Sequence, residues 1–288
     1  MPIRPRMAAL GACVCVALLA VVWFAAFHVG FLGRADESIY QQFGDLSARH
    51  GRIGSAAGHV VAPFDPNPYV YLVAAVLAVA LLRKRPWAAL AVGAIVLGAN
   101  VTTELLKHIV ASPRPGSLFP GGASPLPPAS WPSGHSTAVM SLVLGAVIAA
   151  PARLRPAVTA LGACLAIAVG YSVVATGMHY PSDVLGGFLV ASTWALATVA
   201  ALLGTERWRP AEADSHPTSR ERVSIRAALG APGAVLLAAL LLTAVVLISR
   251  PHDVVSYINA HETFVIGAVG IAALGLTLST GVLLSVRR

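Results

Sequence analysis

Apolar residues form eight blocks in this sequence, and most of the blocks are long enough to cross a bilayer as a helix, which takes about 20 residues. The blocks cover residues 8–32, 69–82, 86–106, 135–152, 156–176, 183–204, 229–249 and 264–285. They show no alternation of apolar and polar residues, which favours helices over a membrane barrel. The sequence therefore predicts an all-α, polytopic membrane helix bundle. The second block is short, so we expect its flanking Tyr69 and Tyr71 to lie at the membrane interface.

The composition agrees with this class of protein. Of the 288 residues, 57% are hydrophobic and 11% are charged, whereas a soluble globular chain has about 25% charged residues. The net charge of +8 does not indicate nucleic-acid binding, because the basic residues are dispersed between the apolar blocks. We interpret this charge as attraction to anionic membrane lipids.

The positions of Lys and Arg predict the orientation. If the N-terminus is inside, the inner segments contain 14 of the 20 basic residues and the outer segments contain six. Because basic residues concentrate in cytoplasmic loops, we expect a multi-pass protein of the cell membrane with both termini in the cytoplasm. The first block also has a basic start, so a cleaved signal peptide is the alternative for that block.

A charged and polar segment separates the last two blocks from the first six. We therefore predict a six-span core at residues 1–204, a cytoplasmic linker at 205–228 and two additional transmembrane helices at 229–288. The sequence does not indicate what the last two spans do.

Ionisable residues in or beside membrane spans are costly and are functional candidates by default. Most of them fall in residues 104–115 (ELLKHIVASPRP), 131–136 (WPSGHS) and 172–183 (SVVATGMHYPSD). The predicted topology brings all three stretches to the outer side, at the end of the third span, the start of the fourth and the turn between the fifth and sixth. We therefore expect one extracytoplasmic site.

Two cations occur in the first stretch. Lys107 and Arg114 are suited to hold a cluster of anionic oxygens, because Lys supplies a point charge and Arg a planar fork. The alternative is that both side chains are anchors at the membrane edge. Glu104 lies one turn before Lys107 and can form a helix ion pair with it.

The second stretch opens a span. A helix that begins near Ser133 and Gly134 would present free backbone N–H groups, which bind anions. The imidazole of His135 would then be a proton donor beside the anion. The alternative is an ordinary serine-capped helix start.

The third stretch separates a histidine from an acid by one helical turn. His179 and Asp183 lie on either side of Pro181, which suits the first position of a helix. This spacing predicts an imidazole nucleophile that a carboxylate orients. The alternative is an acid that offsets the helix dipole beside an interfacial histidine.

Together the three stretches resemble the signature of the phosphatidic acid phosphatase type 2 superfamily. The resemblance spans about 77 residues of motif and the six-span core around them, and it rests on Lys107, Arg114, Pro115, Pro132, Ser133, Gly134, His135, Ser172, His179 and Asp183.

The resemblance implies a role for each of these polar residues. His179 would attack phosphorus and form a phosphohistidine, Asp183 would hold its ring, and His135 would protonate the leaving oxygen. Water would then hydrolyse the intermediate, with no metal or other cofactor. The phosphoryl oxygens would be held by Lys107, Arg114, Ser133, Gly134 and Ser172.

One position departs from the family's pattern. The third motif begins Ser-Arg in the family, whereas Val173 follows Ser172 here. A charged hydrogen bond is worth about 1.5–3 kcal/mol, so the loss would cost roughly ten- to a hundredfold in rate. A slower enzyme, a compensating substrate group and a replacement cation remain alternatives. The candidate cations on the predicted outer side are Arg49, Arg52 and Arg250.

We expect hydrolysis of a lipid phosphate or diphosphate, of the polyprenyl diphosphate or phosphatidate type, at the outer leaflet. Two alternatives use the same residues. The first is a lipid phosphotransferase that uses the same phosphohistidine, and the second is a non-catalytic lipid-phosphate binder or transporter, which Val173 favours. The sequence gives neither the identity of the lipid nor the oligomeric state.

Overall fold

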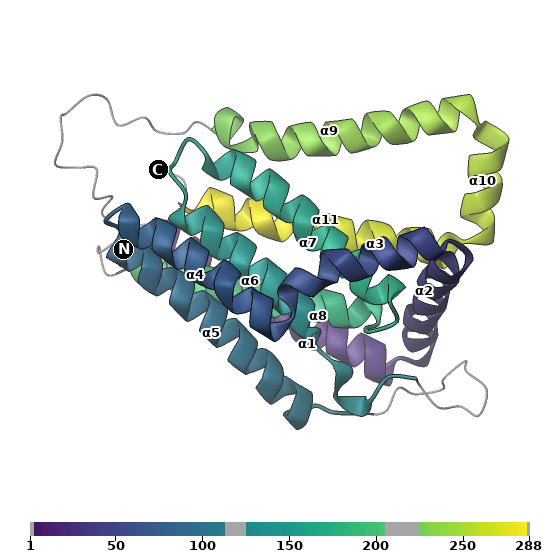
Figure 1. Ribbon diagram of the computed structural model, residues 1–288, viewed down its shortest axis with the longest axis horizontal. Helices are drawn as coiled ribbons and strands as arrows, with labels where there is room; N and C mark the ends of the chain where they lie inside the picture. Colours follow the sequence, from purple (N-terminus) through teal and green to yellow (C-terminus); the bar gives the residue numbers. More distant parts are fainter. Residues whose placement is uncertain (1–2, 113–124, 205–224, 287–288) are drawn as a thin grey trace.

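The computed structural model describes residues 3–112, 125–204 and 225–286, and every regular element within them is a helix (Figure 1). Seven helices are long and apolar enough to span a membrane. They overlap the predicted first, third, fourth, fifth, sixth, seventh and eighth blocks, although α1, α6 and α7 end one to four residues before their blocks do: α1 (Ile3–His28), α5 (Pro86–Ile109), α6 (Gly134–Ala149), α7 (Arg155–Ala175), α8 (Pro181–Gly204), α9 (Ile225–Ser249) and α11 (Glu262–Val286). The predicted all-α membrane bundle is confirmed.

The second block is longer than the sequence indicates and is broken. Helix α3 (Gly51–Val61) continues into the short 3-10 helix η1 (Ala62–Phe64), which meets α4 (Pro66–Leu82) at an angle of 58°. Residues 51–64 and 66–82 are long and apolar enough for a membrane span only in combination. Pro66 restricts the preceding Asp65 to extended backbone, and Asp65 has φ −61° and ψ 151°. The proline therefore accounts for the break.

The break changes the surroundings of the two tyrosines. Tyr71 is exposed, in line with an interfacial place, but Tyr69 is buried and its hydroxyl lies 3.0 Å from the Ser141 hydroxyl. Tyr69 therefore faces the interior of the bundle, because α4 turns this side chain toward α6.

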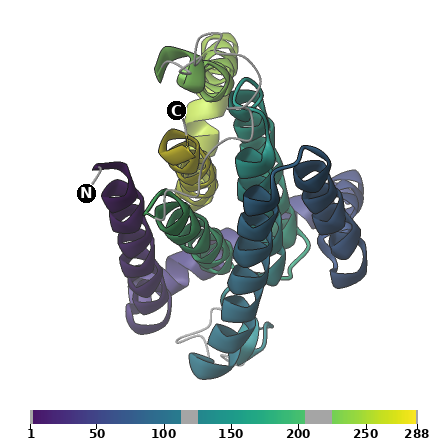
Figure 2. The same ribbon diagram turned by 90° about the vertical axis from the view of Figure 1, so that its left-hand side faces the viewer.

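Helix α6 lies at the centre of the bundle and contacts α5, α7 and α8. Helix α1 covers α8, α11 packs against α7 and α8, and α9 lies along α7 with most of its surface exposed. Figure 2, seen along the bundle, shows α1 and α4 on opposite flanks. Glycines allow close approach of the helices: at Gly98, for example, the indole of Trp194 fills the place of a side chain.

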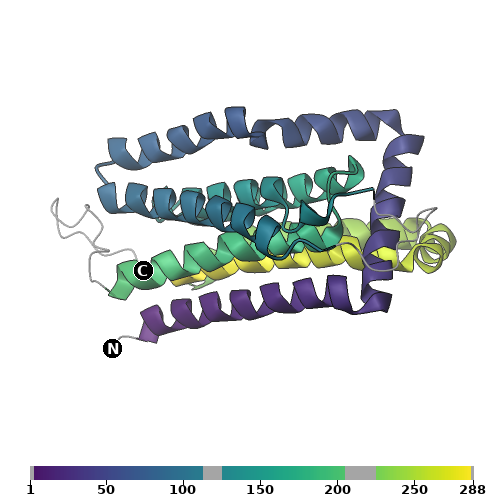
Figure 3. The ribbon, with the colours of Figure 1, turned by 90° about the horizontal axis from the view of Figure 1, so that it is seen from below.

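Two helices run across the bundle rather than along it. Helix α2 (Gly30–Arg49) joins α1 to α3, and α10 (Pro251–Ala260) joins α9 to α11. Both lie at the end of the bundle opposite to the two chain termini (Figures 1 and 3). Both helices lie largely between the predicted apolar blocks.

Helix α11 is an integral part of the packed bundle. Ile271 is fully buried, and a side chain at Gly275 would touch Phe188 of α8. The division of the chain into a core, a linker and a C-terminal pair stays a prediction, and most of the predicted linker lies outside the described residues.

Candidate active site

The connection between α7 and α8 holds the predicted nucleophile. Helix α7 ends at Ala175, and the backbone carbonyl of Val173 accepts the N–H groups of both Met178 and His179, at 2.9 and 3.2 Å. Gly177 has a φ of +74°, a left-handed conformation that glycine adopts at no steric cost. This tight turn fixes the backbone of His179.

His179 and Asp183 form the pair that the spacing predicts. His179 Nδ1 lies 3.3 Å from Asp183 Oδ2, and the Tyr180 N–H donates to the same oxygen at 3.0 Å. The Asp183 side chain is fully buried, whereas that of His179 keeps 12% of its surface. A carboxylate that accepts the Nδ1 proton leaves Nε2 as the ring nitrogen able to attack an electrophile.

The second histidine lies at the start of α6. Ser133 is the N-cap residue, and its hydroxyl accepts the N–H of Ser136 at 3.3 Å. His135 follows in the first turn, and its ring centroid lies 6.4 Å from that of His179. The two histidines are therefore brought together, although 44 positions separate them in the sequence.

A close contact between α6 and α8 holds the two histidines at this separation. The Ser133 N–H donates to the backbone carbonyl of Asp183 at 2.9 Å. A side-chain carbon on Gly187 would lie 2.7 Å from the Ser133 carbonyl oxygen. Only glycine fits this approach without a shift of backbone, and no local pattern around Gly187 indicates that it positions the site.

Of the two cations predicted to hold phosphate, Lys107 lies within the described residues. It lies in the last turn of α5, and its Nζ is 2.7 Å from Glu104 Oε1. A side-chain carbon on Gly134 would lie 3.4 Å from the same Nζ. Lys107 is thus beside the start of α6, and the expected ion pair with Glu104 is present. Arg114 lies outside the described residues.

Ser172 and Val173 lie in the last turn of α7. The Ser172 carbonyl accepts the N–H and the hydroxyl of Thr176, and among the described contacts its own hydroxyl bonds to no site residue. The Val173 side chain is fully buried in the apolar core. The candidate replacement cations are Arg49, Arg52 and Arg250. All three are exposed, and within the described residues none of them bonds to the site.

Helix α2 holds the α7–α8 turn, and sequence analysis missed this contact. Asp36 is buried, and its carboxylate accepts the Ser182 N–H at 2.9 Å and the Ser182 hydroxyl at 2.6 Å. Tyr40 donates its hydroxyl to the Gly177 carbonyl at 3.1 Å. Burial raises the pKa of the Tyr40 phenol, so this donor stays protonated. The acidic residues of α2 can be read from the sequence, but the sequence does not show that Asp36 has a partner 146 positions away.

Sequence analysis also missed Asp65, the residue at the break between η1 and α4. Its Oδ1 lies 3.0 Å from His135 Nε2. The three prolines around it, Pro63, Pro66 and Pro68, are a signal of irregular backbone inside a span. They do not reveal which side chain faces the break.

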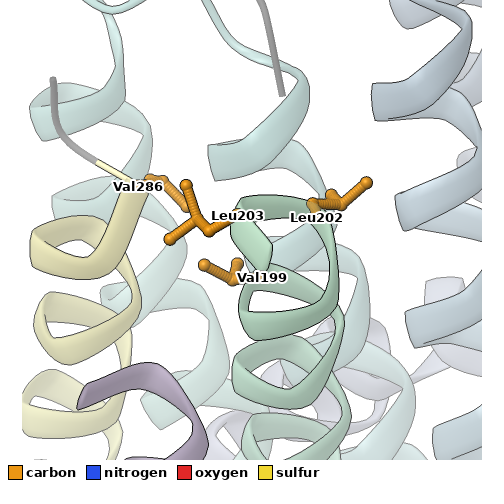
Figure 4. Close-up of a pocket in the computed structure, with 4 residues that line it drawn as sticks. All are labelled: Val199, Leu202, Leu203 and Val286. Carbon is orange, nitrogen blue, oxygen red and sulfur yellow. The ribbon is translucent and has the colours of Figure 1, made fainter. Parts of the chain in front are cut away.

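A small hollow lies at the other end of the bundle, between the ends of α8 and α11 (Figure 4). Its lining is entirely aliphatic and is made by Val199, Leu202, Leu203 and Val286. Because no polar or ionisable side chain lines it, this hollow offers no chemistry.

Comparisons with known proteins find similarity in the part of the chain that contains most of the predicted site residues. A sequence-family model described as the PAP2 superfamily matches residues 88–208. Two proteins named lipid A 1-phosphatase, from Rhizobium johnstonii and Rhizobium etli, are each 34% identical to this chain over 110 residues. The match covers 36% of this chain and 43% and 45% of theirs, so it spans less than half of either relative.

A solved structure shares the fold. The crystal structure of a transmembrane PAP2 type phosphatidylglycerolphosphate phosphatase from Bacillus subtilis superposes with a TM-score of 0.54 at 20% sequence identity, over 69% of this chain and 99% of that one. The matched family segment contains Lys107, the Ser133–His135 stretch, His179 and Asp183. Residues 88–208 of this chain are therefore similar to the PAP2 superfamily, and the likeness to the solved structure concerns the fold.

Proposed function

We propose that this protein is an integral membrane phosphatase that hydrolyses a lipid phosphate or diphosphate through a phosphohistidine intermediate. The observation that carries the proposal is the His179–Asp183 pair beside His135, with ring centroids of the two histidines 6.4 Å apart. A nucleophile that a carboxylate orients and a nearby proton donor are the two groups that displacement at phosphorus needs.

We propose the following steps. Nε2 of His179 attacks phosphorus while Nδ1–H stays bonded to Asp183, and His135 gives a proton to the departing lipid oxygen. Lys107, with Arg114, Ser133, Gly134 and Ser172, is proposed to hold the phosphoryl oxygens, and charge on those oxygens is best stabilised by donors already in place. Water then attacks the phosphohistidine and releases phosphate.

The substrate class is a lipid whose head group carries a phosphate monoester or diphosphate. Phosphatidate and polyprenyl diphosphate fit this description, and the names of the two Rhizobium relatives add lipid A phosphorylated at its 1-position. A site beside the transverse helix α2 suits a substrate that keeps its tails in the membrane.

The test compares purified wild type in detergent with His179→Ala on these three lipids. We expect the substitution to lower phosphate release at least about a thousandfold. Brief reaction with ³²P-labelled substrate should label the wild type with acid-labile, base-stable phosphate and leave the variant unlabelled. His252→Ala, an exposed histidine on α10, is the matched control and should behave as the wild type.

Three outcomes decide between functions. Phosphate release that survives in His179→Ala contradicts the phosphohistidine mechanism. Lipid binding without release by the wild type favours the non-catalytic binder. Transfer of label to an added lipid alcohol in preference to water favours the phosphotransferase.

The side of the membrane has its own test. We propose that the site faces away from the cytoplasm, because the basic residues predict cytoplasmic termini and the termini lie at the end of the bundle opposite to α2 and α10. A cysteine in place of the exposed Ser256 on α10 should react with an impermeant maleimide in intact cells. Reaction only after lysis contradicts this orientation.

A further inference from the structure

Asp65 lies outside the segment that matches the family, yet its carboxylate contacts the proposed proton donor. Asp65 Oδ1 is 3.0 Å from His135 Nε2, a distance typical of an N–H···O hydrogen bond. The matched segment begins at residue 88. Asp65 belongs to the broken span that precedes it, so the family match does not assign this residue a role.

The Asp65 carboxylate does not cap the helix that it precedes. Asp65 is the N-cap residue of α4, a position where an aspartate side chain usually accepts an N–H of the first turn. Pro66 occupies the first position of the helix, and the described contacts contain no such side-chain cap for Asp65. The described partner of this carboxylate is therefore the imidazole of His135.

The register between α4 and α6 is pinned one turn further along. Tyr69 is four residues after Asp65, and its hydroxyl is bonded to Ser141, six residues after His135. Asn100 of α5 donates to the same hydroxyl at 3.4 Å. A polar contact inside an apolar bundle has few alternative partners, so it sets the two helices side by side with Asp65 opposite His135.

Other charged and titratable groups surround His135 as well. The His179 ring faces it from the α7–α8 turn with Asp183 behind, and Lys107 and Glu104 lie beside Gly134 on α5. Among the described groups, however, Asp65 is the one that forms a hydrogen bond with the His135 ring. Asp65 therefore determines how this ring is held.

We propose that Asp65 is a positioning residue for proton donation by His135, an inference that rests on the phosphatase function proposed above. The carboxylate accepts Nε2–H of the imidazolium and leaves Nδ1–H as the proton that is transferred. In this step the His179 Nε2–phosphorus bond forms and the phosphorus–oxygen bond to the lipid breaks. The electron pair of the broken bond goes to the leaving oxygen, which takes the Nδ1 proton of His135. The ring that remains is neutral and is still protonated at Nε2, where Asp65 accepts.

Two substrates with different leaving groups distinguish a role of Asp65 in proton donation from a merely structural role. An alkyl alcohol is a poor leaving group unless it is protonated, whereas p-nitrophenolate leaves as a stable anion. A defect in proton donation therefore slows hydrolysis of dioctanoyl phosphatidate far more than hydrolysis of p-nitrophenyl phosphate. A loss of folded protein slows both to the same extent.

The experiment measures kcat/KM on both substrates for wild type, Asp65→Asn, His135→Ala and the double variant, all as purified full-length protein. We expect Asp65→Asn to lower the value for phosphatidate about ten- to a hundredfold, a fraction of the effect of a general acid, and the value for the aryl phosphate less than about threefold. If phosphatidate is not turned over, lipid A 1-phosphate replaces it as the ester with a poor leaving group.

The double variant tests whether Asp65 acts through His135. Residues that act as a unit are not additive, so the double variant should be no slower than His135→Ala alone. Asp253→Asn is the matched control, since Asp253 is also an acid at a helix start and is exposed on α10. We expect it to leave both rates unchanged.

Equal losses on the two substrates, or additive losses in the double variant, overturn the role of Asp65. If Asp65→Asn does not fold, Tyr69→Phe removes the register contact without touching either partner, and it should show the same leaving-group preference in weaker form. A wild type that shows no His179-dependent turnover of either ester overturns the phosphatase function, and the role of Asp65 with it. His179-dependent turnover without the leaving-group signature overturns only the role of Asp65.

Discussion

The two histidines of the site are both held by carboxylates, but the two pairs are built in opposite ways. His179 and Asp183 are one helical turn apart on a single connection, and the acid is fully buried. His135 and Asp65 are 70 positions apart, they belong to different spans, and the side chain of the acid is 53% exposed. The first pair is a local product of sequence and the second a product of helix packing. The comparison teaches that the ring of His179, the proposed nucleophile, is held more firmly than the ring of His135, the proposed proton donor.

The largest effect should come from the local pair. Asp183→Asn keeps the shape of the side chain but no longer fixes the Nδ1–H tautomer of His179, which we expect to lower kcat by about 10²- to 10⁴-fold. The loss should be of similar size for phosphatidate and p-nitrophenyl phosphate, because attack on phosphorus is slowed in both. If Asp183→Asn lowers kcat less than Asp65→Asn does, the local pair is the less important of the two for activity.

The packing that brings the two pairs together can be broken at one glycine. In Gly187→Ala the added carbon would lie 2.7 Å from the Ser133 carbonyl and 2.9 Å from the Thr137 nitrogen, both of which are backbone atoms. Overpacking of this kind costs about 1–3 kcal/mol, so we expect a lower unfolding temperature in detergent and lower activity on both substrates.

Gly93→Ala is the matched control, because within the described residues nothing lies within 4 Å of a side-chain carbon at this position. Its unfolding temperature should equal that of the wild type or exceed it, since alanine is the better helix former. If the two alanine variants unfold at the same temperature, the contact between α6 and α8 is not as tight as the distances indicate.

Helix α2 supports the local pair from outside, and Asp36 is the stronger of its two contacts. Asp36→Asn weakens two hydrogen bonds to Ser182 at the start of α8, which should cost about 1–2 kcal/mol of stability. Thermal unfolding measures this loss, and the exposed Asp45→Asn on the same helix serves as control. Equal stability of the two variants would show that the α7–α8 turn holds its shape without α2.

The smallest effect is expected at Tyr40. Tyr40→Phe keeps the contact between its ring and Tyr180, whose centroids are 4.7 Å apart, and removes only the hydrogen bond to Gly177. A single neutral hydrogen bond contributes about 0.5–1.5 kcal/mol, so the unfolding temperature should fall slightly and kcat by a few-fold at most. If Tyr40→Phe lowers kcat more than Asp36→Asn does, activity depends more on the contact of α2 with the Gly177 turn than on its contact with the start of α8.

The local features of the site could be read from the sequence because each depends on neighbours in the chain. Apolar blocks of membrane-spanning length predicted the helices, since a lipid-exposed segment must satisfy its own backbone hydrogen bonds. The spacing of His179 and Asp183 around Pro181 predicted a histidine and a carboxylate on one helix start, and both lie where expected. Ser133 before Gly134 likewise predicted the start of α6.

Only the tertiary structure decided which distant side chains meet. The contacts of Asp65 with His135, Asp36 with Ser182 and Gly187 with Ser133 each join different helices. In an apolar bundle, the rotation and register of each helix depend on packing over its whole length, and this sequence contains no local mark of either. The sequence thus determined the spans and the pair of His179 and Asp183, and helix packing determined that His135 has a carboxylate partner as well.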